Sequence, residues 1–151
     1  MGIFPVEIRI FNGKDQESAR QLIISGLGEY FDQIEYSLNR DLDDIGASYI
    51  ETKNDFIIAE IDRRMIGTGA LIQESNDTGR IVRVSVSKPM RNRGIGKTIV
   101  EHLIELGRKR KFKQIVVETN LDWIVANNLY LGLGFKESAR DDISVHLVRK
   151  L

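Results

Sequence analysis

The segment RNRGIGKT, residues 91–98, contains the residue types that bind a phosphate group. Gly94 and Gly96 have no Cβ, so the backbone can curl around an anion and point its N–H groups inward. The arginines of the segment and Lys97 add full positive charge. A helical apolar pattern follows, and the first N–H groups of a helix lack internal acceptors. Together these features predict a phosphate site between a strand and a helix.

Three phosphate-binding patterns compete for this segment. The nucleotide-hydrolase pattern G-x-x-x-x-G-K-[ST] fits only at its GKT end, because its first glycine falls on Arg91. The dinucleotide pattern G-x-G-x-x-G lacks its third glycine in GIGKTI. The third pattern, R-x-x-G-x-G at a strand-to-helix junction, is met at every fixed position by Arg91, Gly94 and Gly96.

The sequence resembles the GNAT family of N-acetyltransferases in this segment and on both sides of it. The acyl-CoA loop of that family has the pattern [Q/R]-x-x-G-x-[G/A]. Residues 83–91, RVSVSKPMR, are similar to the strand that leads into the loop. Residues 115–135 are similar to the next strand and helix, which close on a signature met by Leu129, Tyr130, Leu133, Gly134 and Phe135. The resemblance covers residues 56–150 well, whereas the first fifty residues match only in the order of their elements.

The resemblance implies that acetyl-CoA is the cosubstrate. Its pyrophosphate would bind the N–H groups of the loop, and its pantetheine arm would pair with the preceding strand in the manner of an added β-strand. A β-bulge in that strand would separate it from the strand QIVVE, residues 114–118, and open a cleft. The cofactor-binding residues implied in this way are Val84, Ser85, Val86, Arg91, Asn92, Arg93, Gly94, Ile95, Gly96, Lys97 and Thr98.

The sequence departs from the family at one further cofactor position. The family often has an asparagine early in the helix after the fifth strand, where this chain has Trp123. Asn127 lies one turn later on the same helix face and would replace it as a cofactor-binding residue. The alternative is that Trp123 itself packs on the substrate or the cofactor arm, although a lone tryptophan is more often a core residue.

Two residues are implied as catalytic. Tyr130 matches the family's tyrosine beside the thioester sulfur, the general acid for the departing thiolate. Its alternative role is that of a core aromatic on an amphipathic helix. Glu118 ends a predicted strand where some family members place a general base for the protonated amine. Its alternative role is a salt bridge or a cap for the next helix.

These residues have to be positioned by a mixed α/β fold. Alternating or continuous apolar patterns predict strands at 6–11, 79–87, 112–119 and 142–151, and a hairpin over 55–75 that turns at Asp62–Arg64. The strand at 79–87 should place Val82, Val84 and Val86 on one face. The run at 112–119 is apolar enough for a strand buried on both faces.

Helical patterns fill the intervals between these strands. One helix should begin near Asp15 and break at Gly26 or Gly28, and another should cover 94–111. A third should begin at Asp122 as N-cap and stop at Gly132 or Gly134. Residues 32–45 are helical or irregular. We therefore expect a single GNAT-type domain over residues 1–151, with a mostly antiparallel sheet, one parallel pair, and a splay between its fourth and fifth strands.

Composition narrows the classes of function. The chain has no cysteine, which removes disulfides, thiolate metal sites and a cysteine nucleophile. Its two histidines stand in no ligand pattern, so we predict no metal. The absence of a long apolar run and of a signal peptide predicts a cytoplasmic protein without a membrane partner. The run RKRK, residues 108–111, is best explained as a solvated helix end, so no nucleic acid is expected.

The net charge is zero but divides unevenly along the chain. Residues 1–77 hold 15 acids and 7 bases, and residues 78–151 hold 7 acids and 15 bases. The division is either solvated surface charge or a basic cofactor side opposite an acidic acceptor side. In the second case the acidic stretch at 39–45 would face a cationic amine.

The sequence thus predicts acetyl transfer from acetyl-CoA to a primary amine by direct attack in a ternary complex. The acceptor would be a small cationic molecule or a protein amine. A non-catalytic acyl-CoA sensor of the same fold is the alternative. A homodimer is compatible with the sequence, which does not decide the oligomeric state.

Overall fold

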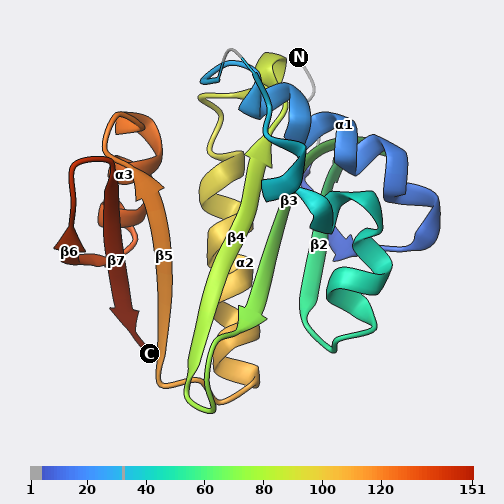
Figure 1. The fold of residues 1–151 in the computed structure, drawn as a ribbon. Helices are drawn as coiled ribbons and strands as arrows, with labels where there is room; N and C mark the ends of the chain where they lie inside the picture. The colour runs from blue at the N-terminus through green and yellow to red at the C-terminus, as the bar shows by residue number, and fades with distance from the viewer. Residues whose placement is uncertain (1–4, 32) are drawn as a thin grey trace.

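Seven strands form one sheet in the order β1-β2-β3-β4-β5-β7-β6, with helices on its faces (Figure 1). The computed structural model describes residues 5–31 and 33–151. The strands are β1 (Glu7–Ile10), β2 (Asp55–Ile61), β3 (Arg64–Gln73), β4 (Thr78–Val86), β5 (Gln114–Asn120), β6 (Lys136–Arg140) and β7 (Ser144–Lys150). The longer helices are α1 (Gln16–Leu27), α2 (Ile95–Lys109) and α3 (Ile124–Gly132). The short helical turns are η1 (Gly13–Asp15), η2 (Tyr36–Leu38), η3 (Arg40–Asp43), η4 (Gly46–Ile50) and η5 (Lys88–Met90).

The strand pairing confirms the predicted mixed sheet. Every pair of neighbouring strands is antiparallel except β4 and β5, which are parallel and joined through α2. The parallel ladder is short, because it joins only residues 78–80 to residues 114–116. Beyond Arg80 the two strands diverge, so the sheet is splayed between its fourth and fifth strands, as predicted (Figure 1).

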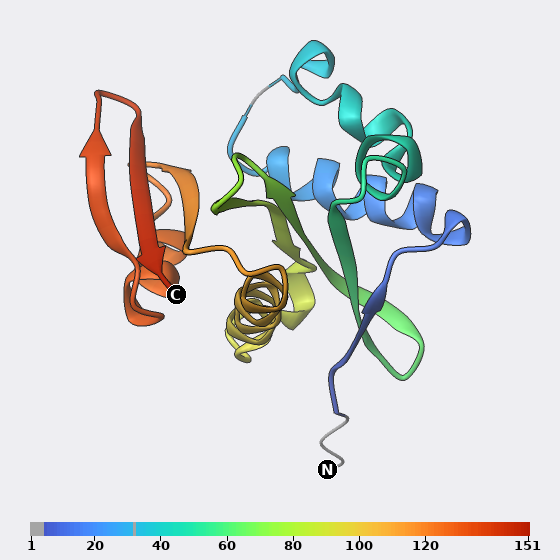
Figure 2. The same cartoon turned by 90° about the horizontal axis from the view of Figure 1, so that it is seen from below.

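Two hydrophobic clusters lie on opposite faces of the sheet. α1 and the short helices η3 and η4 pack on one face of β2–β4, and α2 and α3 pack on the opposite face of the sheet (Figure 2). α2 approaches β3 closely because Gly67 and Gly69 face it, and a Cβ on either glycine would come within 2.7 Å of Ile99. No helix in the described ranges combines the length and the apolar character that a membrane crossing needs.

The fifth strand is buried on one face only, which corrects the prediction of burial on both. Ile115, Val117 and Thr119 are buried under α2 and α3, whereas Val116 is half-buried and Glu118 is exposed. The reason is that α1 covers only β2–β4, so no helix of the described residues covers the other face of β5 (Figure 2). This uncovered face becomes part of the candidate site.

Two local features differ from the sequence prediction. β6 is a strand that the pattern did not reveal, because all five of its residues are exposed and it lies at the edge of the sheet. The N-cap of α3 is Trp123 rather than Asp122, and no side-chain hydrogen bond caps this helix. The predicted hairpin turn is present, with Asp62 and Arg63 both at positive φ, as a two-residue type I′ connection requires.

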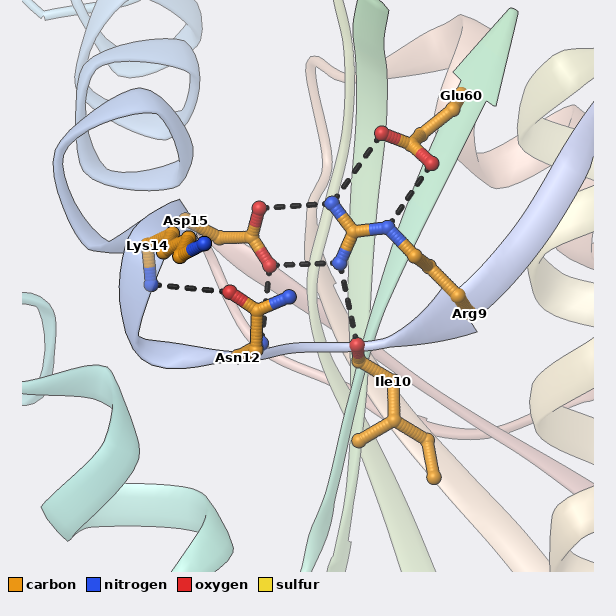
Figure 3. A network of polar contacts seen from close by, with 6 residues as sticks. All are labelled: Arg9, Ile10, Asn12, Lys14, Asp15 and Glu60. Carbon is orange, nitrogen blue, oxygen red and sulfur yellow. Dashed lines mark hydrogen bonds and ion pairs between the residues drawn. The ribbon is translucent and has the colours of Figure 1, made fainter. Parts of the chain in front are cut away.

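Arg9, on β1, connects this strand to β2 and to the start of α1 (Figure 3). Its guanidinium donates to both oxygens of Asp15, at 2.7 Å each, and to both oxygens of Glu60, at 2.9 and 3.2 Å. Asp15 is buried and also accepts a hydrogen bond from the backbone N–H of Asn12. The hydrogen bonds from Arg9 are the main reason that the pKa of Asp15 lies below its ordinary value. The contact therefore ties β1 and β2 to the beginning of α1.

The Asp15 contact should make stability depend on acid pH. A carboxylate with a lowered folded-state pKa stabilises the protein above its unfolded pKa, and this contribution is lost as pH falls through the folded-state value. We expect Asp15→Asn to lower the free energy of unfolding at pH 7 by about 1–3 kcal/mol. The gap to the unmodified protein should narrow below about pH 4.

Urea unfolding at pH 3, 5 and 7 measures this dependence. The control is Asp142→Asn, which removes an exposed carboxylate. An Asp15 variant as stable as this control at pH 7 would show that the contact contributes nothing.

Candidate functional site

The glycine loop gathers backbone N–H groups at the start of α2. Asn92 and Gly94 have positive φ, at 63° and 79°, which curls the loop between η5 and the helix. The first bond of the helix runs from the Thr98 N–H to the Gly94 carbonyl, at 3.1 Å. Within the described ranges, the N–H groups of residues 92–97 donate no hydrogen bond. A Cβ on Gly94 would meet nothing within 4 Å, so the space before these donors is open.

The side chain of Arg91 holds this loop in place. Its Nε donates to the Val86 carbonyl at 3.1 Å, and its Nη2 contacts Glu29 at 2.7 Å. Lys88 lies 4.0 Å from the same carboxylate. The hydrogen bond from Arg91 lowers the pKa of Glu29. Arg91 thus connects the end of β4 to the segment that follows α1, and its guanidinium is engaged within the chain.

A β-bulge interrupts β4 at Arg83, as the family resemblance implied. Thr68 pairs with Ser85 and Ala70 pairs with Val82, so β4 has one extra residue between these pairs. Arg83 has a φ of 57°, and its carbonyl accepts a hydrogen bond from the buried Thr68 hydroxyl at 2.8 Å. The hydroxyl therefore satisfies a carbonyl at the point where the ladder is interrupted.

The bulge also corrects the predicted face of β4. Val82 packs in the cluster under α1, whereas Val84 and Val86 pack in the cluster under α2. The three valines do not share a face, because the extra residue shifts the two-residue alternation of the strand. The bulge instead directs Arg83 toward the α1 face.

An open pocket of about 390 Å³ lies where β4 and β5 separate. Its lining includes Ile72, Arg80, Val82 and Arg83 from β3 and β4, together with Asp41, Tyr49 and Glu118. Glu118 comes from the uncovered face of β5, and its carboxylate lies 3.7 Å from Nε2 of His146. The described residues contain no group of three or more potential ligands that could hold a metal ion.

An ion pair forms one wall of this pocket. Arg83 donates from Nε and Nη2 to the two oxygens of Asp41, at 3.0 and 2.6 Å, and the Tyr49 hydroxyl donates to the same carboxylate. Burial alone would raise the pKa of Asp41, but the hydrogen bonds from Arg83 and Tyr49 outweigh it and hold the pKa below its ordinary value. Burial and the carboxylate raise the pKa of Tyr49. The Asp41 carboxylate is therefore ionised at neutral pH.

The charge division seen in the sequence is matched in part by pairing within the molecule. Four acids of the first half contact cations of the second half, namely Glu29 with Arg91, Asp41 with Arg83, Asp55 with Arg110, and Glu74 with Arg80. In the acidic stretch at 39–45, Asp44 accepts a hydrogen bond from the Ala47 N–H, and Leu42 and Ile45 are buried. The acidic half thus has internal partners, and its charge does not require a cationic substrate.

Tyr130 lies on α3 with its ring in the core. The ring packs edge-on against Phe135 at a centroid distance of 5.3 Å, and only 4% of the residue is exposed. Its hydroxyl makes no hydrogen bond to another described residue. Every fully buried side-chain oxygen of the described residues has a hydrogen-bond partner, so the Tyr130 oxygen is not fully buried. Burial raises the pKa of Tyr130, so the phenol is protonated at neutral pH.

The two other predicted residues on α3 have partners of their own. Asn127 accepts a hydrogen bond from the Thr119 hydroxyl and donates to the Asn120 carbonyl at 3.2 Å, which fastens α3 to the end of β5. Trp123 is half-buried and contacts Tyr30 and Phe31 at centroid distances of 5.2 and 6.3 Å. These aromatic contacts join the segment after α1 to the start of α3.

Sequence reasoning missed the arginines of the pocket. The family motif gives Arg83 only as the start of a strand, and the strand pattern gives Arg80 no further role. An arginine inside a valine-rich strand, as in RIVRVSV, is the available signal, because a charged residue in a central strand needs a partner or a bulge. The partner, Asp41, lies 42 residues away and no local pattern connects the two.

Comparison with known sequences identifies relatives over most of the chain. A family model described as "Acetyltransferase (GNAT) family" matches residues 19–135. N-acetyltransferase 8B of Rattus norvegicus is 32% identical over 109 residues, which cover 68% of this chain and 49% of that protein. The chain therefore spans about half the length of the curated relatives it matches.

Comparison with solved structures identifies the same fold. An acetyltransferase of the GNAT family from Staphylococcus aureus Mu50 superposes with a TM-score of 0.88 at 24% identity, covering 97% of this chain and 99% of that one. The PaiA N-acetyltransferase from Thermoplasma acidophilum, in complex with coenzyme A, superposes with a TM-score of 0.82 at 18% identity, covering 97% and 99%. At these identities the likeness establishes the fold.

The Asp41–Arg83 pair should be required for the stability of the pocket wall. Asp41→Asn would leave the Arg83 guanidinium, whose side chain is 16% exposed, without its counter-ion. We expect the free energy of unfolding at pH 7 to fall by about 1–3 kcal/mol. Asp43→Asn, which changes an exposed neighbour, should stay within about 0.5 kcal/mol of the unmodified protein. Equal stability of the two variants in urea unfolding would contradict the structural role of the pair.

Proposed function

The chain belongs to the acetyltransferase (GNAT) family, and on that premise we propose that it transfers an acetyl group from acetyl-CoA to a primary amine. One observation carries the proposal. Among the described residues, the edge of β4 that faces β5 has no ladder partner beyond Arg80, and this strand leads into the open N–H groups at the start of α2. An unpaired strand edge that ends in an anion site fits a long ligand with a phosphate end.

Coenzyme A has this form. Its pyrophosphate would accept hydrogen bonds from the N–H groups of residues 92–97, with the partial positive charge of the α2 terminus behind them. Its pantetheine arm would pair with the main chain of Val84, Ser85 and Val86 in place of the missing β5 partner. The described complex of PaiA with coenzyme A, which shares this fold, supports the assignment.

The proposed reaction is direct attack in a ternary complex. The amine nitrogen forms a bond to the acetyl carbon, the carbon–sulfur bond breaks, and the sulfur leaves with the electron pair and takes up a proton. The chain has no cysteine that could carry the acetyl group between two steps. Glu118, on the uncovered face of β5 beside the pocket, would accept the proton that the ammonium form of the acceptor must lose before attack.

Tyr130 is the proposed proton donor to sulfur. Its phenol is protonated because burial raises its pKa. A thiolate that forms beside it would be poorly solvated too, so a hydrogen bond from the phenol would stabilise the charge as it develops. Asn127 would act on the cofactor only if its bonds to the end of β5 rearranged, because its polar atoms are engaged there.

Acetyl-CoA should stabilise the protein through the glycine loop. At a concentration one hundred times the dissociation constant, a ligand adds about 2.7 kcal/mol, which corresponds to a rise in Tm of about 5–10 °C for a chain of this size. Gly94→Glu should abolish the rise, because it places bulk and negative charge in the open space before the N–H groups. Gly13→Glu is the control, since a Cβ there also meets nothing within 4 Å. Absence of any shift in the unmodified protein would refute the cofactor assignment.

Tyr130→Phe should separate catalysis from binding. Removing the hydroxyl leaves the packing against Phe135 in place, so the Tm rise with acetyl-CoA should persist. We expect kcat to fall roughly a hundredfold, the lower range for loss of a general acid. Tyr30→Phe, which removes the hydroxyl of an exposed tyrosine, should leave kcat unchanged. A fully active Tyr130→Phe would assign Tyr130 to the core alone, and binding without turnover of any amine would favour an acyl-CoA sensor.

A further inference from the structure

The pocket beside Glu118 contains two arginines, and this bears on the acceptor. Arg80 and Glu118 lie on the same face of the sheet, because Arg80 pairs with Val116 and Glu118 follows two residues later. Arg80 is at the last paired position, which is the closed end of the splay. Two residues along a strand span about 7 Å. An amino acid that makes one hydrogen bond through its amine and another through its carboxylate spans a similar distance.

The carboxylates that accompany the two arginines leave part of each guanidinium available. Asp41 engages Nε and Nη2 of Arg83, and Glu74 engages Nε of Arg80 at 2.6 Å. A guanidinium has five N–H donors, so, among the described residues, Nη1 of Arg83 and both Nη atoms of Arg80 keep donors. Their side chains are 16% and 27% exposed, so water screens them only in part.

The position of Arg83 is imposed by strained backbone. A non-glycine residue at a φ of 57° is unfavourable by about 1–2 kcal/mol, and the hydrogen bond from Thr68 and the ion pair to Asp41 hold it there. The bulge thus directs a cation into the pocket at the point where the acceptor would reach the thioester.

We propose that the acceptor is an amine that also carries a carboxylate, as an amino acid does. This inference rests on the proposed acetyl transfer. The amine lies toward Glu118, the carboxylate accepts hydrogen bonds from the Nη groups of Arg80, and Nη1 of Arg83 supplies further donors. Ile72 and Val82 supply apolar surface for the rest of the molecule. A polyamine has no carboxylate that could accept hydrogen bonds from these guanidinium groups.

Matched acceptor pairs test the proposal directly. The common amino acids and their amides are compared as acceptors with acetyl-CoA at one pH, with spermidine and a short peptide as other amine classes, and released thiol is measured. The amide has the less basic amine, so a preference for the amino acid cannot come from easier deprotonation. We expect kcat/KM for the preferred amino acid to exceed that of its amide at least about tenfold, the factor that ~1.4 kcal/mol produces.

Variants of the pocket locate the source of this preference. Arg80→Gln should raise KM for the amino acid about tenfold or more, change kcat/KM for the amide less than about twofold, and leave the Tm rise with acetyl-CoA intact. Glu74→Gln releases the Nε of Arg80 and should preserve the preference. Arg64→Gln is the matched control, because it removes an exposed arginine at the opposite end of β3 from Ile72.

The outcomes separate this inference from the proposed function. Turnover of amides, peptide or spermidine at rates equal to or above those of amino acids would overturn the inference and leave the acetyltransferase intact. Equal loss of activity toward both members of a pair in Arg80→Gln would also overturn it. If acetyl-CoA binds but no amine accelerates thiol release, the proposed function fails. The inference is then decided by whether amino acids, but not their amides, raise the Tm of the CoA-bound protein.

Discussion

The site depends on the fact that β4 and β5 are paired over only three residues. A parallel ladder between these strands would normally continue, because unpaired N–H and C=O groups in the middle of a sheet are costly. Here it ends at Arg80. The groups released on β4 point into the gap, and they lead directly into the loop before α2. A ligand that pairs with them fills the missing part of the ladder, so the defect in the sheet and the proposed cofactor site are one feature.

The opening is confined to one face because the core on the other face is continuous. α2 crosses from β3 to β5, and its buried residues join those of β5, α3 and β7 in one cluster. On the opposite face, α1 stops at β4 and leaves Glu118 uncovered. The ion pairs from Asp41 and Glu29 then tie the first part of the chain to β4 and to the loop that follows it. The sheet can therefore separate between β4 and β5 while α2 keeps the two parts in one hydrophobic core.

Periodicity and turn chemistry in the sequence predicted most of the fold. The hairpin at Asp62, the apolar stripe of α2 and the stop of α3 at Gly132–Gly134 follow from local rules. β6 could not be predicted, because all of its residues are exposed and it carries no alternation. The one-sided burial of β5 was missed for a different reason: the apolar run alone does not show how far α1 extends over the sheet.

The two halves of the site differ in how they could be predicted, and the difference is physical. The anion site of the loop is made of backbone N–H groups, so it needs only glycines at fixed spacing and a helix start, which a short motif contains. The acceptor pocket is made of side chains. Arg83 reaches it through a bulge that Thr68 and Asp41 stabilise, and Asp41 lies 42 residues from Arg83. A motif can therefore identify the cofactor, whereas the acceptor has to be inferred from charges that only the folded chain brings together.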